Sequence, residues 1–247
     1  MHFLYRLKRH PIPMAADFRH SLVITYAFDA AVLEPLLPPG LALDTWGGFG
    51  FLAIALVDTC AMRPAGLPRA AGVDAHLAGY RIFTRLRGAE SLRGLRILRS
   101  ETDRFAIAYV GNLLTHYQYH LSRISVDEDQ GLRWRIDSEG ADLDVRADLD
   151  STPARPPEES PFEDWRQARR FAGPLPYTFD YEPETDSIIR IEGVRRNWNP
   201  RPVTVEVRRC GFLEQGPFAN ARPRLANAFY VSSIAYEWKR GEVAQCC

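Results

Sequence analysis

Short apolar or alternating segments separated by turns run through most of the chain and predict a succession of strands. The first, SLVITYAF at residues 21–28, has the β-branched and aromatic content of a strand. Comparable segments follow at residues 49–62, 78–87, 92–101, 132–137, 143–149, 177–181, 187–195, 203–209 and 229–238. The segment at 49–62 has few charges and indicates a buried strand. We therefore expect a mainly β protein.

Helical spacing is confined to short segments. Residues 30–37, AAVLEPLL, carry apolar side chains at helical intervals, with Asp29 as an N-cap and Pro38 as a stop. Residues 162–171 form an amphipathic pattern that ends at Gly173. Residues 105–114 fit either a short helix or a buried strand. The helices should therefore be few and short.

The most regular alternation, GNLLTHYQYHLSRISV, covers residues 111–126. A strand would place every second side chain on one face. One face would carry Tyr117, Tyr119, Leu121 and Arg123, and the other His116, Gln118, His120 and Ser122. We interpret the tyrosine face as the wall of a pocket and the histidine face as outer.

Composition narrows the class of protein. Hydrophobic residues make up 46% of the 247 residues and aromatic residues 11%, which suffices for a buried core. The formal net charge is zero, so no overall field would attract nucleic acid or a membrane surface, and we expect neither as a partner. We expect a single domain over residues 1–247, with a core at about 18–240, an irregular arm at 1–17 and a flexible tail at 241–247.

Arginine is the dominant basic residue. Lys8 and Lys239 are the only lysines, so 29 of the 31 basic residues are arginines. Seven lie in or just after the predicted hairpin at residues 78–101: Arg81, Arg85, Arg87, Arg93, Arg96, Arg99 and Arg104. Acidic residues nearby favour a salt-bridged face over a nucleic-acid site. A protein-interaction module that uses this hairpin is the alternative.

The four cysteines show neither metal-ligand spacing nor a disulfide framework, which favours a reducing compartment. We interpret the vicinal Cys246 and Cys247 as part of a frayed tail, with a redox or lipidation site as the alternative. The N-terminus lacks the apolar segment of a signal peptide, and the apolar run at 49–57 is too short to cross a bilayer. We expect a cytoplasmic protein that needs no cofactor.

The absence of common catalytic motifs excludes several kinds of chemistry, and the remaining candidate residues do not identify one activity. The sequence contains no phosphate loop, GxGxxG, GxSxG or HExxH, which argues against nucleotide and common hydrolase chemistry. His116 and His120 are four residues apart, but no third ligand can be identified, so we expect no metal site. Arg19 either binds a ligand carboxylate or pairs with a structural acid. Tyr119 is either an acid/base group in a pocket or a tyrosine at the edge of the core.

Three segments carry a family resemblance: SLVITYAFDAAVLEPLLPPGLALDT, FGFLAIALVDT and GNLLTHYQYHLSRISV. They resemble acetoacetate decarboxylase-like proteins, and more closely the YqjF-like family of uncharacterised proteins (domain of unknown function 2071) in the same superfamily. The resemblance covers about residues 18–240, and its most specific piece is the LxPLLPPGLxLD turn. It implies a mainly antiparallel, cone-like or barrel-like β fold of the acetoacetate decarboxylase-like type, with a few short helices around a small polar cavity.

The resemblance contradicts the decarboxylase mechanism. In the decarboxylases, the strand that matches residues 111–121 carries two adjacent lysines, the first of which forms a Schiff base with the substrate. Tyr119 and His120 occupy these positions here, and neither can form that iminium. A glutamate that the decarboxylases carry in the strand matching residues 49–59 appears here as Leu52.

Two arginines match family positions. Arg19 matches a decarboxylase arginine near the cavity. Arg81 matches the arginine of a Glu-x-Asn-x-Arg pattern typical of YqjF-like proteins, although Leu77 and Gly79 replace the glutamate and asparagine. The resemblance therefore implies that Arg19 and Arg81 hold the anionic end of a ligand.

We expect a cavity protein that binds a small organic acid or carbonyl compound, or acts on it by non-covalent acid/base chemistry. The candidate catalytic residues are Tyr119 and His120, and the candidate ligand-binding residues are Arg19, Arg81, Tyr117 and His116. As an enzyme it would be a lyase, hydratase or isomerase and not a Schiff-base decarboxylase. The alternatives are a non-catalytic small-molecule binder and an interaction module, and edge strands would allow a homo-oligomer.

Overall fold

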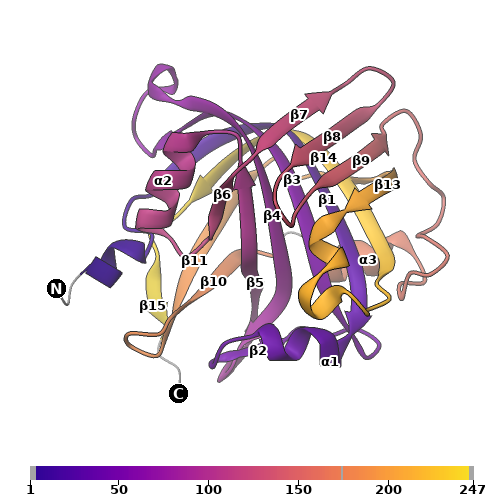
Figure 1. Ribbon diagram of the computed structural model, residues 1–247, viewed down its shortest axis with the longest axis horizontal. Helices are drawn as coiled ribbons and strands as arrows, with labels where there is room; N and C mark the ends of the chain where they lie inside the picture. Colours follow the sequence, from indigo (N-terminus) through magenta and orange to yellow (C-terminus); the bar gives the residue numbers. More distant parts are fainter. Residues whose placement is uncertain (1–3, 174, 245–247) are drawn as a thin grey trace.

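Strands dominate the structure, a computed structural model that describes residues 4–173 and 175–244 (Figure 1). One large sheet consists of β1 (Met14–Asp29), β2 (Leu41–Leu43), β3 (Phe49–Pro64), β4 (Val73–Leu86), β5 (Ala89–Thr102), β6 (Tyr119–Leu121), β10 (Tyr177–Glu182), β11 (Ser187–Arg196), β12 (Arg201–Pro202), β14 (Arg224–Trp238) and β15 (Glu242–Ala244). A small sheet consists of β7 (Arg123–Asp127), β8 (Leu132–Asp137), β9 (Leu143–Asp148) and β13 (Thr204–Cys210). The expected mainly β fold is confirmed.

The helices are short. The α-helices are α1 (Ala30–Leu33), α2 (Phe105–Leu114) and α3 (Trp165–Ala172), and the 3-10 helices are η1 (Leu4–Lys8), η2 (Glu34–Leu36), η3 (Arg69–Ala71), η4 (Gly211–Glu214) and η5 (Gly216–Phe218). Asp29 caps α1 as expected, because its Oδ1 accepts a hydrogen bond of 3.0 Å from the N–H of Ala31. Within the described residues, no helix combines the length and the apolar character needed to span a membrane.

The large sheet has the order β12-β14-β1-β3-β4-β5-β10-β11-β15. Its neighbours pair antiparallel, except that β5 pairs in parallel with β10 and with β6. A further antiparallel pairing joins β11 to β14, so the path of hydrogen-bonded strands from β14 through β1 to β11 returns to β14. The small sheet packs across one face of this arrangement (Figure 1).

Strand β3 is covered on both faces. Leu52 and Leu56 are fully buried in the cluster that includes Trp134 of the small sheet. The alternate residues Ala53 and Ala55 point the other way and line a cavity. Because neither face meets solvent, residues 49–57 read as an almost continuous apolar run rather than an alternating one.

Both ends of the described chain are more regular than expected. The predicted irregular arm at 1–17 is wrong for its last residues, because β1 begins at Met14, which pairs with Trp238. In the predicted flexible tail, residues 242–244 form β15 and pair with β11. The pairing partners of both segments lie far away in the sequence, so local composition did not reveal them. Cys246 and Cys247 lie outside the described residues.

Candidate functional site

A cavity of about 100 Å³ lies on the face of the large sheet that is turned away from the small sheet. Ala53, Ala55 and Arg81 line it from β3 and β4. The charged side chains of the described lining are Arg81, Arg169 and Arg195, and this part of the lining contains no Asp, Glu, His or Lys. The cavity therefore carries positive charge without an acidic side chain to balance it.

Arg81 lies within β4, where it pairs with Ala53 of β3. Its Nε is shielded from solvent and has no hydrogen-bond partner. Burial lowers the pKa of Arg81, and the neighbouring phenols of Tyr236, Tyr117 and Tyr119 partly oppose this shift. A guanidinium removed from water without a counterion costs free energy. Its presence at a cavity therefore points to an anion supplied by a ligand.

Gly79 provides the space that Arg81 occupies. A Cβ atom at position 79 would lie 2.8 Å from Nε of Arg81, closer than real Cβ atoms approach their neighbours. The absence of a side chain two residues before Arg81 therefore lets the guanidinium fold back along β4.

The segment after α2 places two tyrosines beside Arg81. Asn112 holds the backbone of Tyr119 with two hydrogen bonds of 2.8 Å: its Nδ2 donates to the carbonyl oxygen, and its Oδ1 accepts from the N–H. Gln118 has a φ of 52°, in the left-handed region, so the chain is not a regular strand between the tyrosines. The rings of Tyr117 and Tyr119 lie 6.2 Å apart, and both line the cavity.

The prediction of one strand over residues 111–126 is wrong. Residues 111–114 belong to α2, and β6 contains only three residues. Leu121, expected on the tyrosine face, is exposed, whereas Ser122, expected on the outer face, is buried and donates a hydrogen bond to Glu101. Alternation assigns faces only where the backbone stays extended, and the left-handed Gln118 interrupts it.

The phenols of Tyr117 and Tyr119 are protonated at neutral pH. Burial raises the pKa of Tyr119 to about 12, although Arg81 acts in the opposite direction. Burial also raises the pKa of Tyr117 well above its ordinary value, and its hydroxyl is shielded without a hydrogen-bond partner. Arg81 and the two phenols therefore offer hydrogen-bond donors to a bound molecule.

The two candidate histidines lie outside the cavity lining. His120 is exposed on β6. His116 is partly buried, and this burial, together with the positive charges of Lys8 and Arg96, lowers its pKa. Its backbone N–H donates to Asp180. The described residues contain no group of three or more His, Cys, Asp or Glu side chains able to hold a metal ion.

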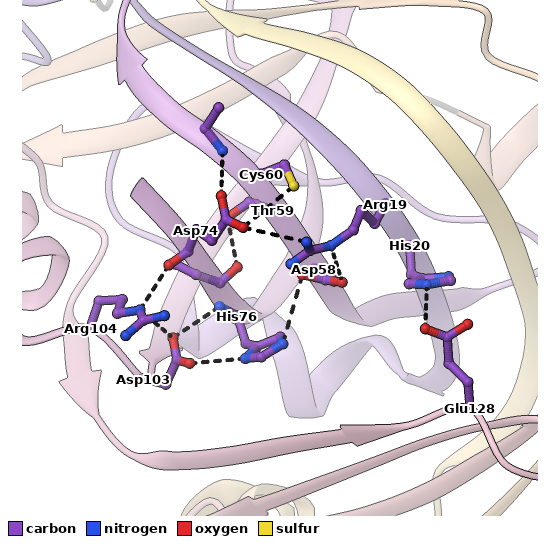
Figure 2. A network of polar contacts seen from close by, with 12 residues as sticks. Arg19, His20, Asp58, Thr59, Cys60, Asp74, His76, Asp103, Arg104 and Glu128 are labelled. Carbon is purple, nitrogen blue, oxygen red and sulfur yellow. Dashed lines mark hydrogen bonds and ion pairs between the residues drawn. The ribbon is translucent and has the colours of Figure 1, made fainter. Parts of the chain in front are cut away.

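Arg19 belongs to a polar network away from the cavity (Figure 2). Its guanidinium donates to both carboxylate oxygens of Asp58, at 2.8 and 2.9 Å, and to Asp74 at 3.4 Å. The hydrogen bonds to Asp58 are the main cause that raises the pKa of Arg19. The pairing of β1 with β3 is irregular at this point, so Phe18 lines the cavity and Arg19 does not. The structure separates Arg19 from Arg81.

The same network joins β1, β3 and β4 through His76. Its Nδ1 lies 2.9 Å from Oδ2 of Asp103, and its Nε2 lies 3.7 Å from Oδ1 of Asp58 (Figure 2). Arg19 therefore has the geometry of a structural ion pair, the second of the two readings that its position in the sequence allowed.

The cavity residues that the sequence did not reveal include Arg195 near the end of β11, Trp198 after it, and Tyr236 of β14. The guanidinium of Arg195 lies 5.1 Å from the ring centroid of Trp198 and 5.2 Å from that of Tyr236. The local signal is the run RRNW at residues 195–198. In a chain with 29 arginines this run resembles any exposed turn.

The other arginines in or just after the β4–β5 hairpin have partners inside the protein, which confirms the expected salt-bridged face. The ion pairs are Arg85–Asp44 at 2.6 Å, Arg93–Asp44 at 2.6 Å, Arg96–Asp180 at 3.0 Å, Arg99–Glu101 at 2.5 Å and Arg104–Asp103 at 3.9 Å. Arg87 donates to the carbonyl oxygen of Leu41 at 2.9 Å. Among these seven described arginines, Arg81 is the one without such a contact, which sets it apart as the functional candidate.

Fold and site together define a mainly β protein with an arginine-lined cavity in which Tyr117 and Tyr119 present protonated phenols. The chain belongs to the DUF2071 family, described as an uncharacterized conserved protein, which it matches over residues 15–234. No curated protein matches the chain.

Solved structures show the same fold at low sequence identity. An acetoacetate decarboxylase-like enzyme from Sphingomonas wittichii RW1 has a TM-score of 0.65 and 13% identity, covering 98% of this chain and 96% of that one. The enduracididine biosynthesis enzyme MppR complexed with pyruvate has a TM-score of 0.64 and 12% identity, covering 96% and 91%. Acetoacetate decarboxylase from Legionella pneumophila has a TM-score of 0.62 and 13% identity, covering 95% and 88%. The acetoacetate decarboxylase-like fold is therefore confirmed.

Proposed function

We propose that the cavity binds a small organic acid or carbonyl compound, with Arg81 holding the anionic end and Tyr119 donating a hydrogen bond to a second oxygen. The observation that carries the proposal is the guanidinium of Arg81, which has no acidic partner and whose Nε has no acceptor in the described structure. A ligand carboxylate would supply both the missing charge and an acceptor. MppR, which has a similar fold, was solved with pyruvate, a small oxo acid.

The lining limits the chemistry that could follow binding. Lys8 and Lys239 are exposed and lie outside the cavity lining, so neither is placed to form a Schiff base there. Tyr119 is protonated at neutral pH and can act as a general acid. The described lining contains no carboxylate or imidazole that could act as a general base. Catalysis would therefore be of a lyase, hydratase or isomerase type in which the phenol protonates or polarises a substrate oxygen.

The same lack of a base favours a second candidate function, a non-catalytic binder of the same compounds. The two are separated by Tyr119→Phe, which removes the acidic hydroxyl and keeps the ring. A drop in turnover of about a hundredfold or more, with ligand binding retained, would identify an enzyme. Binding without turnover across a panel of oxo acids, hydroxy acids and aldehydes would identify a binder.

The binding proposal is tested by calorimetry and thermal unfolding of Arg81→Met with small carboxylates and oxo acids. Met preserves length and removes the charge, so affinity should fall by about ten- to a hundredfold. Without ligand, Arg81→Met should be more stable than the wild type by about 1–3 kcal/mol, because an unpaired desolvated charge is removed.

Arg19→Ala is the matched control. It removes another arginine, one that already pairs with Asp58 outside the cavity, so stability should fall while ligand affinity stays unchanged. Equal affinity of the wild type and Arg81→Met would refute the proposal, as would a well-folded wild type that binds no compound of the panel.

A further inference from the structure

A second set of donors without an acidic counterpart lies in the same cavity. Arg195 stacks on the rings of Trp198 and Tyr236 and donates from Nη2 to the carbonyl oxygen of Leu175 at 3.1 Å. This leaves further N–H groups of the guanidinium without a hydrogen bond or an acid among the described residues. Nε1 of Trp198 is also shielded from solvent without an acceptor.

A single carboxylate bound at Arg81 would leave one of the two arginine charges without a counterion. Arg81 and Arg195 line one cavity whose described residues include no acid, and the charge of Arg195 is itself one of the causes that lower the pKa of Arg81. Two like charges that line one cavity repel each other, and a bound counterion reduces this repulsion. One negative group neutralises one of them.

A purely structural role for Arg195 explains only part of its surroundings. Stacking on two aromatic rings stabilises the faces of the guanidinium, as cation–π contacts do in many proteins. It does not use the edge N–H groups, nor does it give the indole N–H of Trp198 an acceptor. The third lining arginine, Arg169, is exposed and contacts Asn199 at 3.4 Å, so it is not part of this set.

We propose that the ligand carries two acidic groups: one carboxylate binds Arg81 and Tyr117, and the other binds Arg195 and the indole N–H of Trp198. The inference rests on the proposed function of the cavity and narrows its ligand to dicarboxylic acids. Much of the remaining described lining is apolar, including Ala53 and Ala55 of β3, which suits a hydrocarbon spacer. A volume of about 100 Å³ is well below that of sites for drug-sized ligands, so the spacer is short.

The test compares acids that differ only in the second carboxylate. Succinate is paired with butyrate, glutarate with pentanoate and adipate with hexanoate, and the dissociation constants are measured by calorimetry. For at least one pair the wild type should bind the dicarboxylate tighter by about ten- to a hundredfold. Arg195→Met should remove this preference and leave the affinity for the monocarboxylate unchanged.

Further variants locate the two ends. Trp198→Phe keeps a ring under Arg195 and removes the indole N–H. The affinity for dicarboxylates should therefore fall by about tenfold. Arg81→Met should weaken the binding of both dicarboxylates and monocarboxylates, and Arg19→Ala should weaken the binding of neither. Thermal unfolding of each variant establishes that it is folded.

The outcomes distinguish the two proposals. Equal affinity for both members of every pair in the wild type would overturn the dicarboxylate inference and leave the monoanion site intact. The same holds if Arg195→Met weakens both members of a pair equally, because Arg195 would then not recognise the second carboxylate. A folded wild type that binds neither class would overturn the proposed function and the inference with it.

Discussion

Asp180 is a buried carboxylate that lies outside the cavity lining but affects the pKa values of two tyrosines within it. It is 1% exposed, and Nη1 of Arg96 donates to its Oδ1 at 3.0 Å. Burial raises its pKa from the ordinary 3.8 to about 6, although Arg96 and the backbone N–H of His116 oppose the shift. When ionised, its charge raises the pKa values of Tyr117 and Tyr119. Asp180 therefore helps to keep both phenols protonated.

A titratable group of this kind makes stability depend on pH. Between about pH 4 and pH 6 the folded state holds a proton on Asp180 that the unfolded state has released, so the free energy of unfolding should decrease as the pH rises through this window. Asp180→Asn keeps an acceptor for Arg96 and does not titrate. The free-energy difference between the variant and the wild type should therefore grow by up to about 3 kcal/mol from pH 4 to pH 7.

Urea unfolding of both proteins at several pH values measures this difference. The other buried carboxylates, such as Glu101 and Asp44, are common to both proteins, and their contributions cancel. Parallel profiles for the two proteins would show that Asp180 titrates normally in the folded state.

At the scale of residues, the sequence identified Arg81, Tyr117 and Tyr119, which the structure brings together. It could not separate Arg81 from Arg19, because both match family positions and both are arginines on strands. What distinguishes them is the pairing irregularity in β1, which directs Arg19 to Asp58. Such an irregularity depends on contacts with two other strands and leaves no mark in a local pattern.

At the scale of elements, α2 and β6 together position the tyrosines. Gly111 in α2 faces the ring of Tyr119, and a Cβ atom at this position would lie 2.5 and 2.6 Å from two ring carbons. The sequence placed Gly111 at the start of a strand because the next residues alternate. A helix packed closely on an aromatic ring requires this glycine, and only the tertiary contact shows why.

Packing and helix propensity make opposite predictions for Gly111→Ala. Alanine favours a helix over glycine by about 1 kcal/mol. The methyl group would overlap the rigid ring of Tyr119, and overpacking of this kind typically costs about 1–3 kcal/mol. We expect a net loss of stability of about 1 kcal/mol and weaker ligand binding, since Tyr119 must move. Urea unfolding and calorimetry measure the two effects.

Val110→Ala is the control for this prediction, because Val110 is the neighbouring residue of the same helix and is 47% exposed. It should leave stability unchanged or raise it by a few tenths of a kcal/mol. If Gly111→Ala also stabilised the protein and bound ligand normally, the packing of α2 against Tyr119 would not position the phenol.

At the scale of the whole molecule, strand content was predictable and strand order was not. Apolar periodicity is local, so ten segments were recognised as strands from a few residues each. Pairings such as Met14 with Trp238, or the parallel contact of β5 with β10, join distant segments. The cavity walls come from these distant pairings, which is why Arg195 and Trp198 could not be assigned to the site in advance.

Trp134 of the small sheet provides the test of whether both sheets form the single domain that we propose. It is fully buried in a cluster shared with β1, β3 and β4 of the large sheet. Its ring lies edge-on to the imidazole of His76, with 5.7 Å between the ring centroids. If the sheets unfold together, Trp134→Ala should destabilise the whole protein by about 3–5 kcal/mol. Trp134→Phe should destabilise it by less, because it keeps an aromatic ring in the core. Far-UV circular dichroism and the fluorescence of the remaining tryptophans should then give coincident urea transitions in both variants. Two separated transitions would mean that the small sheet is an independent unit, and that the large sheet holds the arginine-lined cavity without it.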